Sequence, residues 1–156
     1  KNYKLQITKE TVAHYIDLLE KSFVIFRLSG FSRNLRKEIT KMDKIFFWDN
    51  GVRNAIINNF FSHEERNDMG ALWENFVVSE RMKKNRYEKN GYESFFWRLH
   101  SGAEIDYIEQ QEGGKLLGVE VKSRTKKVSA PQSFKENYPN SEFQVIYPEN
   151  SVEFLV

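Results

Sequence analysis

Three short strand patterns follow one another between residues 94 and 123, and this run constrains the fold more than any other feature. The glycine pair Gly113-Gly114 supplies a turn between the second and third patterns, as in an antiparallel meander. A long amphipathic helical pattern precedes the run, and a short helix and one more strand pattern follow it. In chain order the six segments are 68–84, 94–99, 104–109, 116–123, 131–137 and 143–147. The sequence therefore predicts an α/β (α+β) fold with an αβββαβ core and a mixed sheet.

The first 66 residues carry a different pattern, in which a helix precedes a long basic hairpin. Thr8 is a suitable N-cap for the helix, and Asn50-Gly51 indicates a turn after the hairpin. The helix, the two strands and a second short helix are expected over 9–21, 23–28, 44–48 and 52–60. This outline is typical of a winged-helix module. We therefore expect a winged-helix-like connector over 1–66 and a second domain over 67–156.

Composition limits the class of protein. The 156 residues are 40% hydrophobic and 15% aromatic, which is enough for a core without disulfides or a structural metal. The absence of cysteine excludes a zinc ribbon, a thiol nucleophile and a disulfide scaffold, and it is compatible with the cytoplasmic location that we expect. No apolar run approaches the length of a bilayer crossing, so we expect no membrane partner.

A net charge of +2 carries little information about partners, so a nucleic-acid surface must come from local clusters of basic residues. Such clusters occur in the predicted wing and after the third strand pattern of the core. The residues that we expect to contact DNA are Arg33, Arg36, Lys37, Lys41 and Arg124. A charged hairpin also serves simply to keep a surface solvated, and both interpretations stay open.

The third strand pattern of the core carries an acid and a base on one face. In Val119-Glu120-Val121-Lys122, side chains two residues apart share a face, so Glu120 and Lys122 point away from the valines. Asp106 lies on the preceding strand pattern, one hairpin away. Two neighbouring carboxylates repel, and a hard cation is the usual way to keep both ionised. We expect Asp106 and Glu120 to hold Mg²⁺ or Mn²⁺, and Lys122 to stabilise charge on a scissile phosphate.

Two further acids lie near this set. Glu74 flanks the apolar stripe of the long helix and is the natural fourth member, although it could instead cap the stripe or pair with a lysine. Glu104 should share the strand face of Asp106, either as an outer partner of the site or as the partner of Arg98. A Glu-x-Lys pattern on an exposed strand is commonly a solvated ion-pair ladder, so a purely structural role stays open.

Three motifs in this order resemble the PD-(D/E)XK restriction-endonuclease-like superfamily. They are Ala71-Leu72-Trp73-Glu74-Asn75, Asp106 and Val119-Glu120-Val121-Lys122. Four segments further resemble the C-terminal domain of unknown function of bacterial and archaeal AAA-type P-loop ATPases; they are 15–21, 32–38, 70–76 and 102–106. The resemblance implies a nuclease-like fold with Asp106, Glu120, Lys122 and Glu74 as catalytic residues. It also implies an N-terminal ATPase module in the same parent protein.

Three functions are compatible with these residues. The first is Mg²⁺-dependent hydrolysis of DNA, for which a homodimer is possible because many nucleases of this fold dimerise. The second is a catalytically inactive DNA-binding or docking module of the ATPase, and the third is recognition of a protein partner. Gly113-Gly114-Lys115 lacks the remaining residues of a phosphate loop, so we expect no ATP site in this chain. The chain begins at Lys1 rather than Met, and we expect it to be a fragment of a larger protein.

Overall fold

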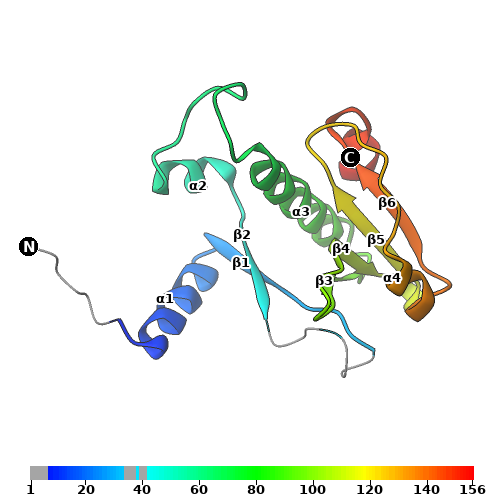
Figure 1. The fold of residues 1–156 in the computed structure, drawn as a ribbon. Coiled ribbons are helices and arrows are strands. Elements are labelled where there is room, and N and C mark those ends of the chain that lie inside the picture. Colours follow the sequence, from blue (N-terminus) through cyan, green and yellow to red (C-terminus); the bar gives the residue numbers. More distant parts are fainter. Residues whose placement is uncertain (1–6, 34–37, 39–41) are drawn as a thin grey trace, which may run out of the picture.

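The computed structural model describes residues 7–33, 38 and 42–156. Its helices are α1 (Lys9–Lys21), α2 (Asn50–Ile56), α3 (Met69–Glu88), α4 (Gln132–Asn137) and α5 (Ser151–Leu155). Its strands are β1 (Ile25–Ser29), β2 (Asp43–Phe47), β3 (Glu93–Arg98), β4 (Glu104–Gln110), β5 (Leu116–Val121) and β6 (Glu142–Ile146). Two short 3₁₀ turns are η1 (Glu112–Gly114) and η2 (Pro148–Asn150). The predicted order of helix, three strands, helix and strand is confirmed from α3 to β6 (Figure 1).

The main sheet has four strands in the order β3-β4-β5-β6. The first two pairings are antiparallel, whereas β5 and β6 pair in parallel. A parallel pair needs a crossover connection, and α4 lies in the one between β5 and β6. Gly113 and Gly114 close the link from β4 to β5 with φ of 70° and 75°, a backbone region that favours glycine. The predicted α+β class with a mixed sheet is therefore confirmed.

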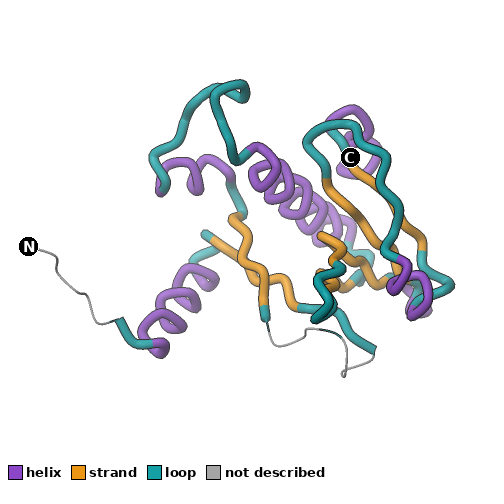
Figure 2. The backbone as a smooth tube through the Cα atoms, in the orientation of Figure 1, coloured by secondary structure: helices purple, strands orange, loops and turns teal. Residues whose placement is uncertain are grey.

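The sheet is covered on both faces, because its strands contribute side chains to two separate core clusters. In one cluster, Val77 and Val78 of α3 pack with Val119 of β5. In the other, Phe134 of α4 packs with Trp97 of β3, with ring centroids 5.2 Å apart. Figure 2 shows the long α3 helix alongside the strands. This packing holds β4 and β5 rigidly between two helices.

One buried ion pair ties α3 to β4. Glu109 is completely buried and accepts hydrogen bonds from Arg81 Nε and Nη2, both at 2.8 Å. Asn85 and Gln111 donate to the same carboxylate at 2.8 and 2.9 Å. Arg81 Nη1 also donates to the Phe154 carbonyl at 2.8 Å, which connects α5 to the pair. Burial opposes ionisation of Glu109, but these donors outweigh it and lower the pKa of the carboxyl.

The β1–β2 hairpin docks on α3 and on the edge of the sheet. Gly30 forms a parallel bridge to Phe96 of β3, and the Phe31 N–H donates to the Phe96 carbonyl at 2.6 Å. On the other strand, the buried Asn75 of α3 bonds both the N–H and the carbonyl of Phe47, each at 2.8 Å. The hairpin is therefore fixed to the core at both of its strands.

Helix α1 has the predicted bounds, and its predicted cap is confirmed by a bond from the Thr11 N–H to Thr8 Oγ1 at 3.2 Å. The helix lies away from the four-stranded sheet (Figure 1). None of its residues is buried. Its exposed apolar side chains are Val12, Tyr15, Leu18 and Leu19. The apolar stripe of α1 is thus open to solvent.

Some expectations differ from the structure. The predicted turn at Asn50-Gly51 is wrong, because Asp49 caps a helix there and accepts from the N–H groups of Gly51 and Val52 at 2.6 and 3.1 Å. Helix α3 runs to Glu88, beyond the expected end at residue 84. The boundary expected between residues 66 and 67 falls between α2 and α3 and stays a prediction. Within the described ranges, no helix has the length and apolarity that a membrane crossing needs.

Candidate functional site

Asp106 and Glu120 come from adjacent strands, at one end of the paired segment. The backbone ladder between β4 and β5 ends at the pair Tyr107 and Val119. Just beyond it, Asp106 Oδ2 accepts a hydrogen bond from the Val121 N–H at 2.9 Å. Val119 and Val121 are buried while Glu120 is partly exposed, which confirms the predicted alternation of faces. The structure therefore brings the two predicted carboxylates to the same point of the sheet.

Lys122 follows directly after β5 and pairs with Glu120. Its Nζ lies 2.5 Å from Glu120 Oε1, and its backbone N–H donates to the Ile146 carbonyl at 2.9 Å. Burial raises the pKa of Glu120; Lys122 opposes this change and the charge of Asp106 adds to it. For Lys122, burial lowers the pKa, but the bond to Glu120 and the negative charges of Glu120, Asp106 and Glu74 together outweigh burial, so the net shift is upward. The expected acid–base neighbourhood is present.

Glu74 reaches the same cluster from α3. Burial raises the pKa of its carboxyl, Lys44 counters that rise, and the negative charge of Asp106 reinforces it. Glu74 also pairs with Lys44 of β2, which contacts Asp106 as well, so Glu74 does more than cap the apolar stripe. All four residues that the sequence singles out for catalysis thus lie in one cluster, called here the acidic group, which is drawn from α3, β4 and the end of β5.

A cation from the N-terminal hairpin also enters this group. Lys44 Nζ of β2 lies 2.5 Å from Glu104 Oε1, 3.1 Å from Glu74 Oε1 and 3.8 Å from Asp106 Oδ1. Glu104 also pairs with Arg98, at 3.5 Å between Oε2 and Nε. Glu104 therefore contacts Arg98, as expected, and Lys44 of the cluster at the same time. Sequence reasoning missed Lys44, because a lysine in a strand pattern carries no sign of which distant acids it will meet.

The donor chemistry of the site fits a hard divalent cation. Mg²⁺ prefers oxygen ligands and is commonly bound through one or two carboxylates, with waters and substrate phosphates completing its shell. Asp106 and Glu120 form such a pair of carboxylates. The described part of the chain contains no group of three or more His, Cys, Asp or Glu residues arranged to hold a metal. Asp106 and Glu120 are therefore the two carboxylates that would hold such an ion.

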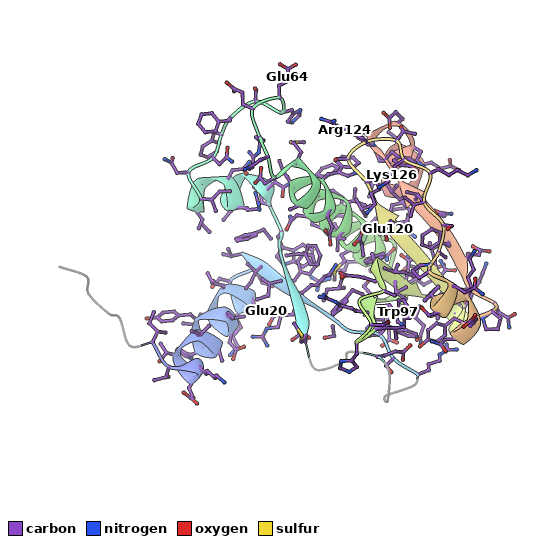
Figure 3. The ribbon with its side chains drawn as sticks, viewed as in Figure 1. Glu20, Glu64, Trp97, Glu120, Arg124 and Lys126 are labelled. Atoms are coloured by element: carbon purple, nitrogen blue, oxygen red, sulfur yellow. The ribbon has the colours of Figure 1, made fainter. Side chains whose placement is uncertain are left out.

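The basic residues predicted to contact DNA are only partly covered by the structure. Arg36, Lys37 and Lys41 lie outside the described residues. Arg33 is exposed, but its Nη2 donates to the Gly114 carbonyl at 2.8 Å, which links the hairpin to the turn between β4 and β5. Arg124 is exposed on the loop after β5, as is Lys126 (Figure 3). Of the predicted DNA contacts, Arg124 is thus the one that follows closely after Lys122 along the chain.

A hollow of about 570 Å³ lies between the start of α3 and the loop after β5. Its lining includes Leu72, Trp73, Phe76, Ser123 and Arg124. The Trp73 and Phe76 rings stack with centroids 5.4 Å apart. Trp73 precedes Glu74 and Ser123 follows Lys122 in the sequence, so the hollow is lined by sequence neighbours of the candidate residues.

Two family models match the chain. A family model described as "Domain of unknown function (DUF4143)" matches residues 69–155, more than half of the chain. A second, described as "Domain of unknown function (DUF8612)", matches residues 2–63. No curated protein and no solved structure matches the chain. The match over α3 to α5 shows that the chain belongs to the DUF4143 family.

Proposed function

We propose that residues 69–155 form a nuclease-type domain of the PD-(D/E)XK kind, which hydrolyses DNA phosphodiester bonds with a divalent cation such as Mg²⁺. The observation that carries this proposal is the convergence of Glu74, Asp106, Glu120 and Lys122, which ion pairs and the bond from the Val121 N–H to Asp106 connect. These side chains come from separate elements of the fold, so closeness along the sequence does not explain why they lie together. The strand order and the mixed sheet also suit the proposal.

Each side chain has a role that its position supports. Asp106 and Glu120 would hold the cation, and the bond from the Val121 N–H fixes the orientation of Asp106. The bound cation supplies charge neutralisation at a scissile phosphate and a lower pKa for water. Lys122 carries a positive charge beside Glu120, where it can stabilise the charge that develops on the phosphate oxygens. Glu74 adds a further carboxylate to the site, where it accepts a hydrogen bond from Lys44 at 3.1 Å.

The surroundings favour a polyanionic substrate. Arg124 and Lys126 are exposed on the loop that continues from Lys122, and basic side chains attract the phosphate backbone of DNA. The hollow beside them offers the Trp73 and Phe76 rings, to which a base could be presented.

A cleavage assay tests the proposal. Supercoiled plasmid and labelled linear duplexes are incubated with the protein and Mg²⁺ or Mn²⁺, beside Asp106→Asn and Glu120→Gln. We expect cleavage that either substitution reduces by about a hundredfold or more. The matched control is Glu142→Gln, which alters an exposed glutamate on β6. Cleavage at the wild-type rate in Asp106→Asn would sink the proposal.

A second function, a docking module, has its own supporting observation in α1. We propose that the parent protein carries an N-terminal AAA-type P-loop ATPase module, as the resemblance of segments 15–21 and 70–76 implies. An amphipathic helix with no buried residue is suited to pack on such a neighbour. Co-purification with the ATPase module should be lost in Leu18→Glu and kept in His14→Glu, which changes an exposed polar residue of the same helix. Equal co-purification in both variants would count against docking through α1.

Inactive DNA binding and self-association can be tested with the same protein. Anisotropy titrations of duplex DNA at two salt concentrations should show a steep loss of affinity with salt if basic residues carry the binding. Binding without cleavage would favour the inactive alternative. A homodimer stays a prediction, and sedimentation velocity measures it directly.

A further inference from the structure

We infer that the Lys44 ammonium occupies the acidic group in the absence of metal, and that it competes with a divalent metal ion for the same carboxylates. The inference rests on the proposed function, because it concerns the regulation of that site. It assigns the β1–β2 hairpin a role in metal binding, although the hairpin lies outside residues 69–155.

The contacts of Lys44 resemble those of a bound cation. Its ammonium is within 4 Å of carboxylate oxygens from Glu104, Glu74 and Asp106. Its side chain is 24% exposed, and that of Asp106 is 15% exposed, so water screens these charges only in part. One ammonium thus partly neutralises three carboxylates, the task that a hard cation performs in sites of this kind.

Lys44 contacts one of the predicted metal ligands, Asp106, directly. The Oδ1 atom of Asp106 faces Lys44 at 3.8 Å, while its Oδ2 atom is already bonded to the Val121 N–H. A metal ion on Asp106 would therefore lie close to the Lys44 ammonium. Like charges a few ångströms apart in a half-buried site repel strongly, so binding of the ion requires Lys44 to move.

The hairpin holds Lys44 in this position. The bonds between Asn75 and Phe47 fix β2 to α3, and the ammonium lies 5.5 Å from the centre of the Phe96 ring. Burial lowers the pKa of Lys44, but Glu74, Glu104 and Asp106 outweigh it, so Lys44 stays charged at neutral pH. Release of the hairpin from α3 would remove the competing charge, which couples the docking of the hairpin to metal binding.

Calorimetric titration of Mn²⁺ tests the inference with wild type, Lys44→Met and Lys115→Met. Methionine keeps the length of the stem and removes the charge. Lys115 is the matched control, because its pair with Glu142 is exposed on both sides. We expect Lys44→Met to bind Mn²⁺ about tenfold more tightly than wild type, or better, since a full charge near the site is removed. Lys115→Met should bind like wild type.

The outcomes separate this inference from the proposed function. Equal Mn²⁺ affinity in wild type and Lys44→Met overturns the inference and leaves the metal site standing. Absence of Mn²⁺ binding from all three proteins overturns both.

A second measurement does not depend on the folding of Lys44→Met. In wild-type protein with ¹³C-labelled lysine, Mg²⁺ should shift the Lys44 side-chain signal and leave the Lys115 signal in place. Lys44→Arg identifies the Lys44 signal by removing it. An unmoved Lys44 signal at calorimetric saturation with Mg²⁺ overturns the inference.

Discussion

Replacing Arg81 by methionine should leave the buried carboxylate of Glu109 without its ion-pair partner. Arg81 supplies two of the donors to Glu109, and the exposed fractions of the two side chains are 11% and 0%. Methionine keeps the unbranched stem beside Phe154, whose ring lies 4.4 Å from the Arg81 guanidinium carbon in the wild type. The change therefore removes charge and hydrogen bonds while it preserves much of the packing.

Removing one partner of a buried ion pair lowers stability by about 3–5 kcal/mol, because the other charge stays buried without compensation. In a chain of this length, about 3 °C of melting temperature corresponds to 1 kcal/mol, so Tm should fall by about 10–15 °C. Lys83→Met is the control on the same helix: its partly exposed pair with Glu80 should contribute about 0–0.5 kcal/mol.

The pH dependence of the loss gives a second test. In wild type the pKa of Glu109 is lowered, so its stabilising contribution is present above the unfolded pKa and is lost as pH falls through the folded pKa. Without Arg81, burial should raise the pKa of Glu109, and protonation should relieve the destabilisation as pH falls. Urea unfolding should therefore show a gap between wild type and Arg81→Met that narrows on acidification. A loss below about 1 kcal/mol, or a gap independent of pH, would refute this reasoning.

Two further outcomes are expected. Asn75→Ala should lower the free energy of unfolding by about 2 kcal/mol in urea titrations, because it leaves the N–H and the carbonyl of Phe47 without their partner. The control is Asn140→Ala, which changes an exposed asparagine. An equal effect of the two substitutions would contradict the role of Asn75 in fixing β2 to α3. Because burial raises the pKa of Glu120, Mn²⁺ affinity should weaken on acidification at a higher pH than an ordinary glutamate would give. Calorimetry across this range tests the second outcome, and affinity that is constant down to the ordinary glutamate pKa would argue against Glu120 as a ligand.

The core of the fold was predictable because its signals are local. The alternation through Val119, Glu120 and Val121 fixes which side chains face α3, and Gly113-Gly114 fixes where the chain turns. Together they place Glu120 on the next strand to Asp106 with no further information. The turn predicted at Asn50-Gly51 was wrong, because the preceding residue, Asp49, caps a helix that begins at Asn50.

The long-range pairs could not be predicted. Lys44 meets Glu74 because β2 docks on α3, and Arg81 meets Glu109 because α3 crosses β4. Each of these residues has the composition of an ordinary surface position, and nothing in its immediate sequence shows the partner. Helix α5 was also missed, because it spans only Ser151–Leu155 and its place depends on the burial of Phe154 rather than on a periodic pattern.

The central claim is that Asp106 and Glu120 together form a site for a divalent cation. The most direct test is calorimetric titration of Mn²⁺ into Asp106→Asn and Glu120→Gln, each made in wild type and in the Lys44→Met background. We predict saturable binding that either substitution abolishes and that Glu142→Gln leaves unchanged. Mn²⁺ binding that survives both substitutions would contradict the claim. So would the absence of Mn²⁺ binding from both the wild type and Lys44→Met when neither carboxylate is substituted.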